Sequence, residues 1–188
     1  MKIFEHYGYE CKIPITIYGL LRNGLNIYEI GNTLGNLHEL YNIKQDDYVI
    51  FYYGFNDIQR SIHLHYKNNW EYGIETIFYD YVNYINLLRT TYNIKPIISC
   101  IYPNPRKDAC EQNPTGSYEE RIKYTNHANK TLKKCCYNNE ISFLDIYDYI
   151  TDENGFIKKE LTNDSIHLDY NNEELRTFVE NNIYVYCH

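Results

Sequence analysis

Short apolar runs alternate with longer amphipathic segments along this chain, and that alternation limits its fold more than any other feature. The apolar runs have the length of β-strands; they are Lys12–Tyr18, Asp47–Tyr53, Lys95–Tyr102 and Ile141–Ile146. Asp47–Tyr53 is apolar without polar alternation, which is typical of a strand buried on both faces. Lys95–Tyr102 is followed by Pro103 and Pro105, which cannot continue a strand ladder.

The longer segments carry apolar residues at three- and four-residue steps, a spacing that predicts amphipathic helices. These segments are Leu25–Tyr41, Trp70–Tyr92, Tyr118 to about Asn138, and Glu173 to about Tyr186. Gly31 and Gly35 weaken the first of them, because glycine disfavours helix interiors. Ser117 and Glu120 have the spacing of a capping box, so we expect the third helix to begin directly after Ser117.

Alternating strands and helices build βαβ units, in which helices cover both faces of a parallel sheet. We therefore predict an α/β fold with three layers and a flavodoxin-like parallel sheet of about four or five strands. No internal repeat or linker divides the sequence, and 188 residues suit one domain, residues 1–188. Ligands in such folds bind beyond the carboxyl ends of the strands, so residues that directly follow strands are the candidates for chemistry.

Two polar motifs follow predicted strands. Gly54-Phe55-Asn56-Asp57 comes directly after Asp47–Tyr53, and an amide such as that of Asn56 can donate a hydrogen bond to a developing oxyanion. Gly, Asn and Asp are also common in plain turns, which is the alternative interpretation. Asp164 and His167 lie after the last predicted strand, and an aspartate three residues before a histidine can orient its imidazole. With seven histidines in the chain, such a pair also arises by chance.

Together and in this order, the two motifs resemble blocks of the SGNH, or GDSL-like, hydrolase family. Gly54-Phe55-Asn56-Asp57 is similar to the third block, in which the asparagine donates to the oxyanion. Asp164 and His167 are similar to the fifth block, which holds the acid and the base of a catalytic triad. The resemblance extends from about Lys12 to the C-terminus.

The family's second block supplies a glycine backbone amide to the oxyanion hole. Arg22-Asn23-Gly24-Leu25 lies roughly where this block is expected, and Gly24 is our choice for the glycine. Gly31 and Gly35 are alternatives for the same role.

The resemblance implies a carboxylic-ester hydrolase or acyl transferase that needs neither a metal ion nor an organic cofactor. A serine would attack the ester carbonyl, His167 would take its proton, and Asp164 would orient His167. Asn56 and Gly24 would hold the oxyanion. By family analogy alone, O-acetylated glycans are a substrate class to expect.

The nucleophilic serine of the family's first block, Gly-Asp-Ser after a strand, has no match here. The five serines of the sequence stand in other contexts: Ser61, Ser99, Ser117, Ser142 and Ser165. One hypothesis is that the sequence starts just past this block and is incomplete at its N-terminus, with Lys12–Tyr18 as the family's second strand. The other is true loss of the nucleophile, which gives a pseudoenzyme. Loss of the first strand would leave unpaired backbone groups in the sheet, which is costly.

Further candidates surround the third block. Arg60 and His63 follow it closely and could contact an anionic group of the substrate, next to Gly54 and Asp57. Ordinary loop charges are the alternative. His63 and His65 would share one face of a strand and could bind a metal, but no third ligand has fitting spacing, so we favour histidines that face solvent or lie at the rim of the site.

The cysteines predict free thiols, some of them buried. None of them forms a C-x-x-C pair, so the spacing of a zinc site is missing. They are Cys11, Cys100, Cys110, Cys135, Cys136 and Cys187.

Charge and composition exclude several classes of partner. A net charge of -7 disfavours nucleic-acid binding, and no run is long and apolar enough to span a bilayer. The N-terminus lacks the apolar stretch of a signal peptide, so we expect a cytoplasmic protein. The excess of Tyr, Asn, Ile and Lys fits an AT-rich genome, such as that of a large DNA virus or of an AT-rich microbe.

The expected partner is a small-molecule or glycan ester, in a homo-oligomer or within a larger parent chain. Two other functions stay open: an inactive binding module for a glycan or an acylated ligand, and a structural domain of a larger assembly.

Overall fold

The computed structural model describes residues 44–107, 115–169 and 171–187, and it has the predicted α/β architecture. Three features predicted from the sequence lie outside the described residues: the strand Lys12–Tyr18, Gly24 and the helix Leu25–Tyr41. Ten elements follow one another in the described part: β1 (Tyr48–Phe51), η2 (Asp57–Ser61), α3 (Ile62–His65), α4 (Trp70–Tyr92), β2 (Lys95–Ser99), α5 (Tyr118–Asn138), β3 (Ser142–Leu144), α6 (Tyr147–Ile150), η3 (Lys159–Leu161) and α7 (Glu173–Cys187).

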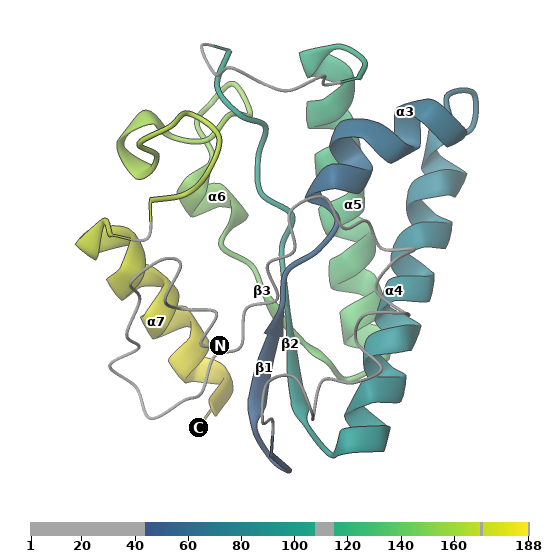
Figure 1. The fold of residues 1–188 in the computed structure, drawn as a ribbon, viewed down its shortest axis with the longest axis vertical. Coiled ribbons are helices and arrows are strands. Elements are labelled where there is room, and N and C mark those ends of the chain that lie inside the picture. The colour runs from purple at the N-terminus through teal and green to yellow at the C-terminus, as the bar shows by residue number, and fades with distance from the viewer. Residues whose placement is uncertain (1–43, 108–114, 170, 188) are drawn as a thin grey trace.

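The three described strands form a parallel sheet in the order β1-β2-β3. Tyr48 pairs with Lys95 at the start of β1, and Ile97 pairs with Ser142 where β3 joins. Helices α4 and α5 cover one face of the sheet and α7 covers the other, which gives the three layers (Figure 1). The prediction of a parallel sheet between helices is therefore confirmed, and the total of four or five strands stays a prediction.

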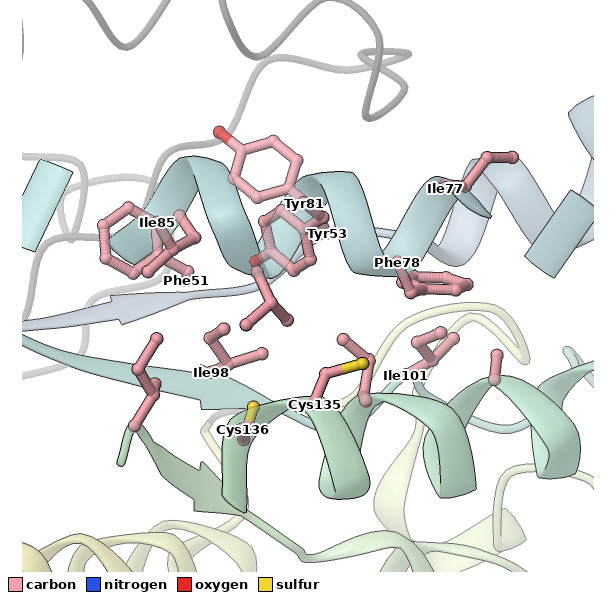
Figure 2. Close-up of a cluster of buried hydrophobic side chains, with 14 of the residues drawn as sticks. Phe51, Tyr53, Ile77, Phe78, Tyr81, Ile85, Ile98, Ile101, Cys135 and Cys136 are labelled. Atoms are coloured by element: carbon pink, nitrogen blue, oxygen red, sulfur yellow. The ribbon is translucent and has the colours of Figure 1, made fainter. Parts of the chain in front are cut away.

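Alternate residues of the strands build two cores, one on each face. On the α4/α5 face, Phe51 and Tyr53 from the first strand region and Ile98 from β2 pack against Phe78 and Tyr81 of α4 (Figure 2). Cys135 and Cys136 of α5 close this cluster from the other side. Burial of several large side chains of this kind, at about 1.5–3 kcal/mol each, holds the helices on the sheet.

The second core lies under α7. It is built by Ile97, Cys100 and Leu144 from the strand region and by Leu175, Val179 and Ile183 from α7. Strand β1 differs from our expectation of burial on both faces, because Val49 and Phe51 are buried whereas Tyr48 and Ile50 are only half-buried.

Local sequence signals set the ends of the long helices. Ser117 accepts a hydrogen bond from the backbone of Glu120, whose side chain in turn accepts from the Ser117 backbone, so the capping box is confirmed. Asn93 ends α4 in the left-handed conformation at φ 51°. Next to it Arg89 donates to the backbone oxygens of Asn139 and Glu140, which ties α4 to the end of α5 at the amino edge of the sheet.

The capping box generates a stability prediction. Ser117→Ala removes the acceptor for the Glu120 amide, and we expect it to lower the free energy of unfolding by about 1 kcal/mol. Urea denaturation followed by circular dichroism measures this change. Ser117→Asp is the matched control, because aspartate is an equally good cap; equal losses in both variants would contradict the capping role.

Candidate active site

The two polar motifs predicted from the sequence lie on segments at the carboxyl edge of the sheet. Asn56 lies five residues after the end of β1, and Asn104 to Lys107 follow β2. The loop with Asp164 and His167 precedes α7, and it lies with α6 and α3 at the end of the sheet drawn uppermost in Figure 1. Parallel strands all end at one edge, which is where this fold places its ligands.

Gly54 shapes the turn that carries Asn56. Its φ of 110° lies in the region that only glycine adopts readily, and a Cβ there would be 2.6 Å from Cε1 of Phe78. The chain therefore leaves β1 sharply and enters the π-helix η2, with Asn56 at its N-cap. The Asn56 side chain makes no capping hydrogen bond and is half-buried, so its amide is not committed to the helix.

Asp164 and His167 form the hydrogen-bonded pair that their spacing predicts. Asp164 Oδ2 lies 2.6 Å from His167 Nδ1. Asp164 Oδ1 accepts from the backbone N–H groups of Ile166 and His167, at 2.8 and 2.7 Å. Ser165 between them has a φ of 66°, which folds the loop back on itself. An ionised Asp164 accepts a hydrogen bond from Nδ1–H, so Nε2 of the imidazole is left as the basic nitrogen.

The electrostatics of this loop favour an ionised Asp164. Partial burial by itself raises the pKa of this carboxyl group. The hydrogen bonds from the His167 ring and from the backbone amides of His167 and Ile166 outweigh it and lower the pKa to about 2. Both side chains remain accessible, with 45% of Asp164 and 67% of His167 exposed. The base is therefore available to a ligand at the surface of the loop.

Hydrogen bonds connect the two motifs through the segment that follows β2. Gln59, three residues after Asn56, donates from Nε2 to Oδ1 of Asn104 at 3.0 Å. Two residues further along, the backbone N–H of Arg106 donates to the backbone oxygen of Ser165 at 2.9 Å. The oxyanion motif and the acid–base motif are thus attached to opposite ends of residues 104–106.

The remaining predicted site residues have different environments. Asp57 is completely buried and Gly54 is buried, whereas Arg60 is exposed. His63 is half-buried, with its ring 4.8 Å from that of Tyr124. The burial of Asp57 favours a role in holding the turn, and substrate contacts by any of these four residues stay predictions.

The hypothesis that His63 and His65 share a strand is wrong. Both lie on α3, where residues two apart do not share a face. Ile58 and Ile62, both fully buried, follow the four-residue spacing that makes this segment helical. Within the described ranges, no three His, Cys, Asp or Glu side chains gather as metal ligands.

The serines have the contexts expected of them. Ser99 lies in β2, Ser142 in β3, and Ser117 caps α5. Ser61 ends η2, and Ser165 provides the turn between Asp164 and His167. None of these five positions is a turn from a strand into a helix.

Cys100, Cys135 and Cys136 are free and buried, as predicted for part of the set. Burial raises the pKa of the Cys100 and Cys136 thiols to about 12, and it also raises the pKa of Cys135. Thiols of this kind are unreactive at neutral pH. In the described segments, no helix combines the length and apolarity that a bilayer span requires.

Sequence reasoning missed a buried polar group behind the turn, formed by Gln59, Asn104 and Arg121. Arg121 is 2% exposed although it lies on the long helix α5. The only signal was its place on the apolar face of that helix, three residues before Tyr124 and seven before Ala128.

Sequence comparison gives one match to a family model, that of the GDSL-like lipase/acylhydrolases, over residues 11–174. No curated protein matches the chain.

Solved structures with the same fold include a GDSL-like lipase from Bacteroides thetaiotaomicron, at 19% identity and a TM-score of 0.61, covering 96% of this chain and 76% of that one. A protein assigned as an acylhydrolase, from Bacteroides fragilis, also has 19% identity, with a TM-score of 0.62 and coverage of 96% and 74%. The acetyl xylan esterase AlAXEase has 17% identity and a TM-score of 0.56, with coverage of 90% and 80%.

The low pKa of Asp164 generates a prediction for acid unfolding. A carboxyl group whose pKa is lower in the folded state stabilises the protein above its unfolded pKa, near 4, and loses that contribution as pH falls through about 2. We expect the difference in unfolding free energy between wild type and Asp164→Asn to be constant above about pH 4 and to shrink below it.

Urea denaturation at a series of pH values measures this difference. Asp80→Asn, at an exposed position of α4, controls for the loss of one negative charge. A wild-type advantage over Asp164→Asn that does not change between about pH 5 and about pH 1, one unit beyond each of these two pKa values, would contradict the assignment.

Proposed function

Because the chain belongs to the GDSL-like lipase/acylhydrolase family, we propose that its carboxyl-edge site acts on carboxylic esters, as a hydrolase or an acyl transferase. The observation that carries this proposal is the 2.6 Å contact between Asp164 Oδ2 and His167 Nδ1 on an accessible loop. That contact fixes the tautomer of a general base in the way ester hydrolysis requires.

Each part of the site has a chemical role in this proposal. His167 Nε2 takes a proton from the attacking hydroxyl group and later returns it to the leaving alkoxide. Asp164 stays ionised and stabilises the imidazolium that forms in between. The Asn56 amide donates to the carbonyl oxygen as it gains negative charge, a contribution of about 10² to 10³ in turnover for a single donor.

The source of the attacking hydroxyl group decides the rate. All five serines are placed in other contexts, and residues 1–43 contain none. In the absence of a serine nucleophile, we propose that the attacking group is a water molecule activated by His167. It adds hydroxide to the ester carbonyl carbon, and the carbon–oxygen bond to the alcohol breaks. Loss of a serine nucleophile typically lowers turnover by about 10⁶, so we propose that this chain is a strongly impaired esterase.

Acetyl esters of sugars are the substrate class we propose. Support comes from the fold shared with an acetyl xylan esterase, and it is an argument by analogy. Hydrolysis of a small acyl group also needs no long apolar channel.

The esterase proposal predicts a slow activity that depends on His167. We expect the 188-residue chain to hydrolyse p-nitrophenyl acetate slightly faster than buffer, and His167→Ala to abolish this difference. Release of p-nitrophenol measures both rates. His65→Ala is the matched control, because His65 is exposed on α3 and should not matter. Equal rates for wild type and His167→Ala would rule out a His167-dependent esterase.

A second candidate, an inactive ester-binding module, is favoured by one specific observation. The family match includes the predicted strand Lys12–Tyr18, and that stretch is followed directly by Gly19-Leu20-Leu21. If this strand is the family's first rather than its second, two leucines stand where the family has Asp-Ser. The chain would then bind an ester without a nucleophile to attack it.

Restoring the nucleophile tests this alternative. We expect Leu20→Asp combined with Leu21→Ser to raise p-nitrophenyl acetate hydrolysis by at least about 10²-fold, a fraction of the loss that removing a serine nucleophile causes. In that variant the new serine attacks the carbonyl carbon, His167 carries its proton to the leaving alcohol, and water then hydrolyses the acyl-serine. Adding His167→Ala should abolish the gain.

Leu25→Ser is the control, because it adds a hydroxyl four residues away from the restored position. A gain that persists without His167, or one that Leu25→Ser produces equally, would show that position 21 is not the site of the nucleophile.

A further inference from the structure

A closed ring of hydrogen bonds lies behind the turn that carries Asn56. Its side chains are Gln59, Asn104 and Arg121, which are 6%, 0% and 2% exposed. A buried arginine is rare unless its donors are paired, because an unpaired guanidinium is costly to remove from water. The burial of Arg121 therefore requires hydrogen-bond acceptors around its guanidinium group.

The hydrogen bonds lead from Gln59 through Asn104 and Arg121 and back to Gln59. Gln59 Nε2 donates to Asn104 Oδ1 at 3.0 Å, and Arg121 Nε donates to the same oxygen at 3.4 Å. Arg121 also donates from one terminal nitrogen to the backbone oxygens of Thr115 and Gly116, at 3.3 and 3.1 Å. Thr115 closes the ring, because its N–H and its hydroxyl both donate to the backbone oxygen of Gln59.

The ring connects the two halves of the site. Gln59 belongs to η2, whose N-cap is Asn56. Asn104 lies two residues before Arg106, whose backbone N–H donates to the oxygen of Ser165, beside Asp164. A shift of Asn104 therefore moves the turn of Asn56 relative to the loop of His167.

We propose that Arg121 and Asn104 are positioning residues, which set the place of the Asn56 amide relative to His167 through this ring. The inference deepens the proposed function and rests on its assignment of Asn56 and His167. Arginine suits the position because its planar group donates in several fixed directions at once, which lysine cannot do. Neither residue is assigned a contact with the substrate.

A matched pair of variants at Asn104 isolates the ring. Asn104→Leu keeps the volume but removes the oxygen that accepts from Gln59 and Arg121. Asn104→Asp keeps an oxygen there, and it removes no bond of the ring, since Nδ2 of Asn104 has no hydrogen-bond partner in the described segments. Arg89→Ala is the control for general destabilisation, because Arg89 joins α4 to α5 at the opposite edge of the sheet.

Peptide-resolved hydrogen exchange tests the positioning without any need for turnover. We expect Asn104→Leu and Arg121→Lys to speed exchange in residues 56–61 and 164–168 by at least about tenfold, with little change in α7. Asn104→Asp and Arg89→Ala should leave exchange in those two segments as in wild type. The urea concentration is adjusted for each protein so that all of them have the same free energy of unfolding. Unchanged exchange in both segments for Asn104→Leu would overturn the inference.

Kinetics of p-nitrophenyl acetate hydrolysis test the catalytic consequence, in the background of Leu20→Asp and Leu21→Ser. We expect Arg121→Lys to lower kcat by about 10- to 100-fold with little change in KM, as misplacement of about 1 Å does elsewhere. In a chain that also carries Asn56→Ala, Arg121→Lys should have almost no further effect, because the two changes act on one interaction. If the separate effects of Asn56→Ala and Arg121→Lys on kcat multiply in the combined variant, the inference is overturned and the role of Arg121 is purely structural.

The outcomes separate this inference from the proposed function. If neither the wild type nor the restored chain shows turnover that depends on His167, the proposed function fails, and the exchange experiment still decides whether the ring holds the two segments. If turnover depends on His167 but the effects of Asn56→Ala and Arg121→Lys on kcat multiply, the proposed function stands and the positioning role fails.

Discussion

Burial of a parallel sheet between two layers of helices is the constraint on which the rest of the structure depends. Helices α4 and α5 bury one face of the sheet, with Phe51 and Ile98. Helix α7 buries the other face, with Ile97 and Leu144. Since all described strands run in the same direction, their carboxyl ends meet at one edge. The polar residues that follow β1 and β2 are gathered there by the packing of apolar ones.

Local signals made much of this fold predictable from the sequence. The helix Trp70–Tyr92 has the predicted bounds, because its apolar spacing is regular and Asn93 can adopt the left-handed conformation that ends it. Helix α5 begins where its capping box places it. The strands are shorter than predicted, since their last apolar residues, such as Ile101, lie in the loops that follow. Only the strand assumed for His63 and His65 was wrong, because the four-residue spacing of the buried Ile58 and Ile62 makes this segment helical.

The two parts of the site differ in how far the sequence could predict them. The Asp164–His167 contact joins residues three apart in one loop, so their spacing was enough. The ring of Gln59, Asn104 and Arg121 joins residues 45 and 17 apart, and no local pattern announces contacts of that range. Such contacts arise only once η2 and α5 have packed against the loop after β2.

The compactness of the Asp164–His167 motif has a consequence for how a protein of this kind can change over time. Four consecutive residues hold the imidazole, and the positive φ of Ser165 is the one unusual backbone angle within them. Mutations in distant segments can loosen or shift the whole loop, but they remove none of the contacts within these four residues. The paired aspartate and histidine can therefore persist as a unit while the segments that supply the other groups of the site change.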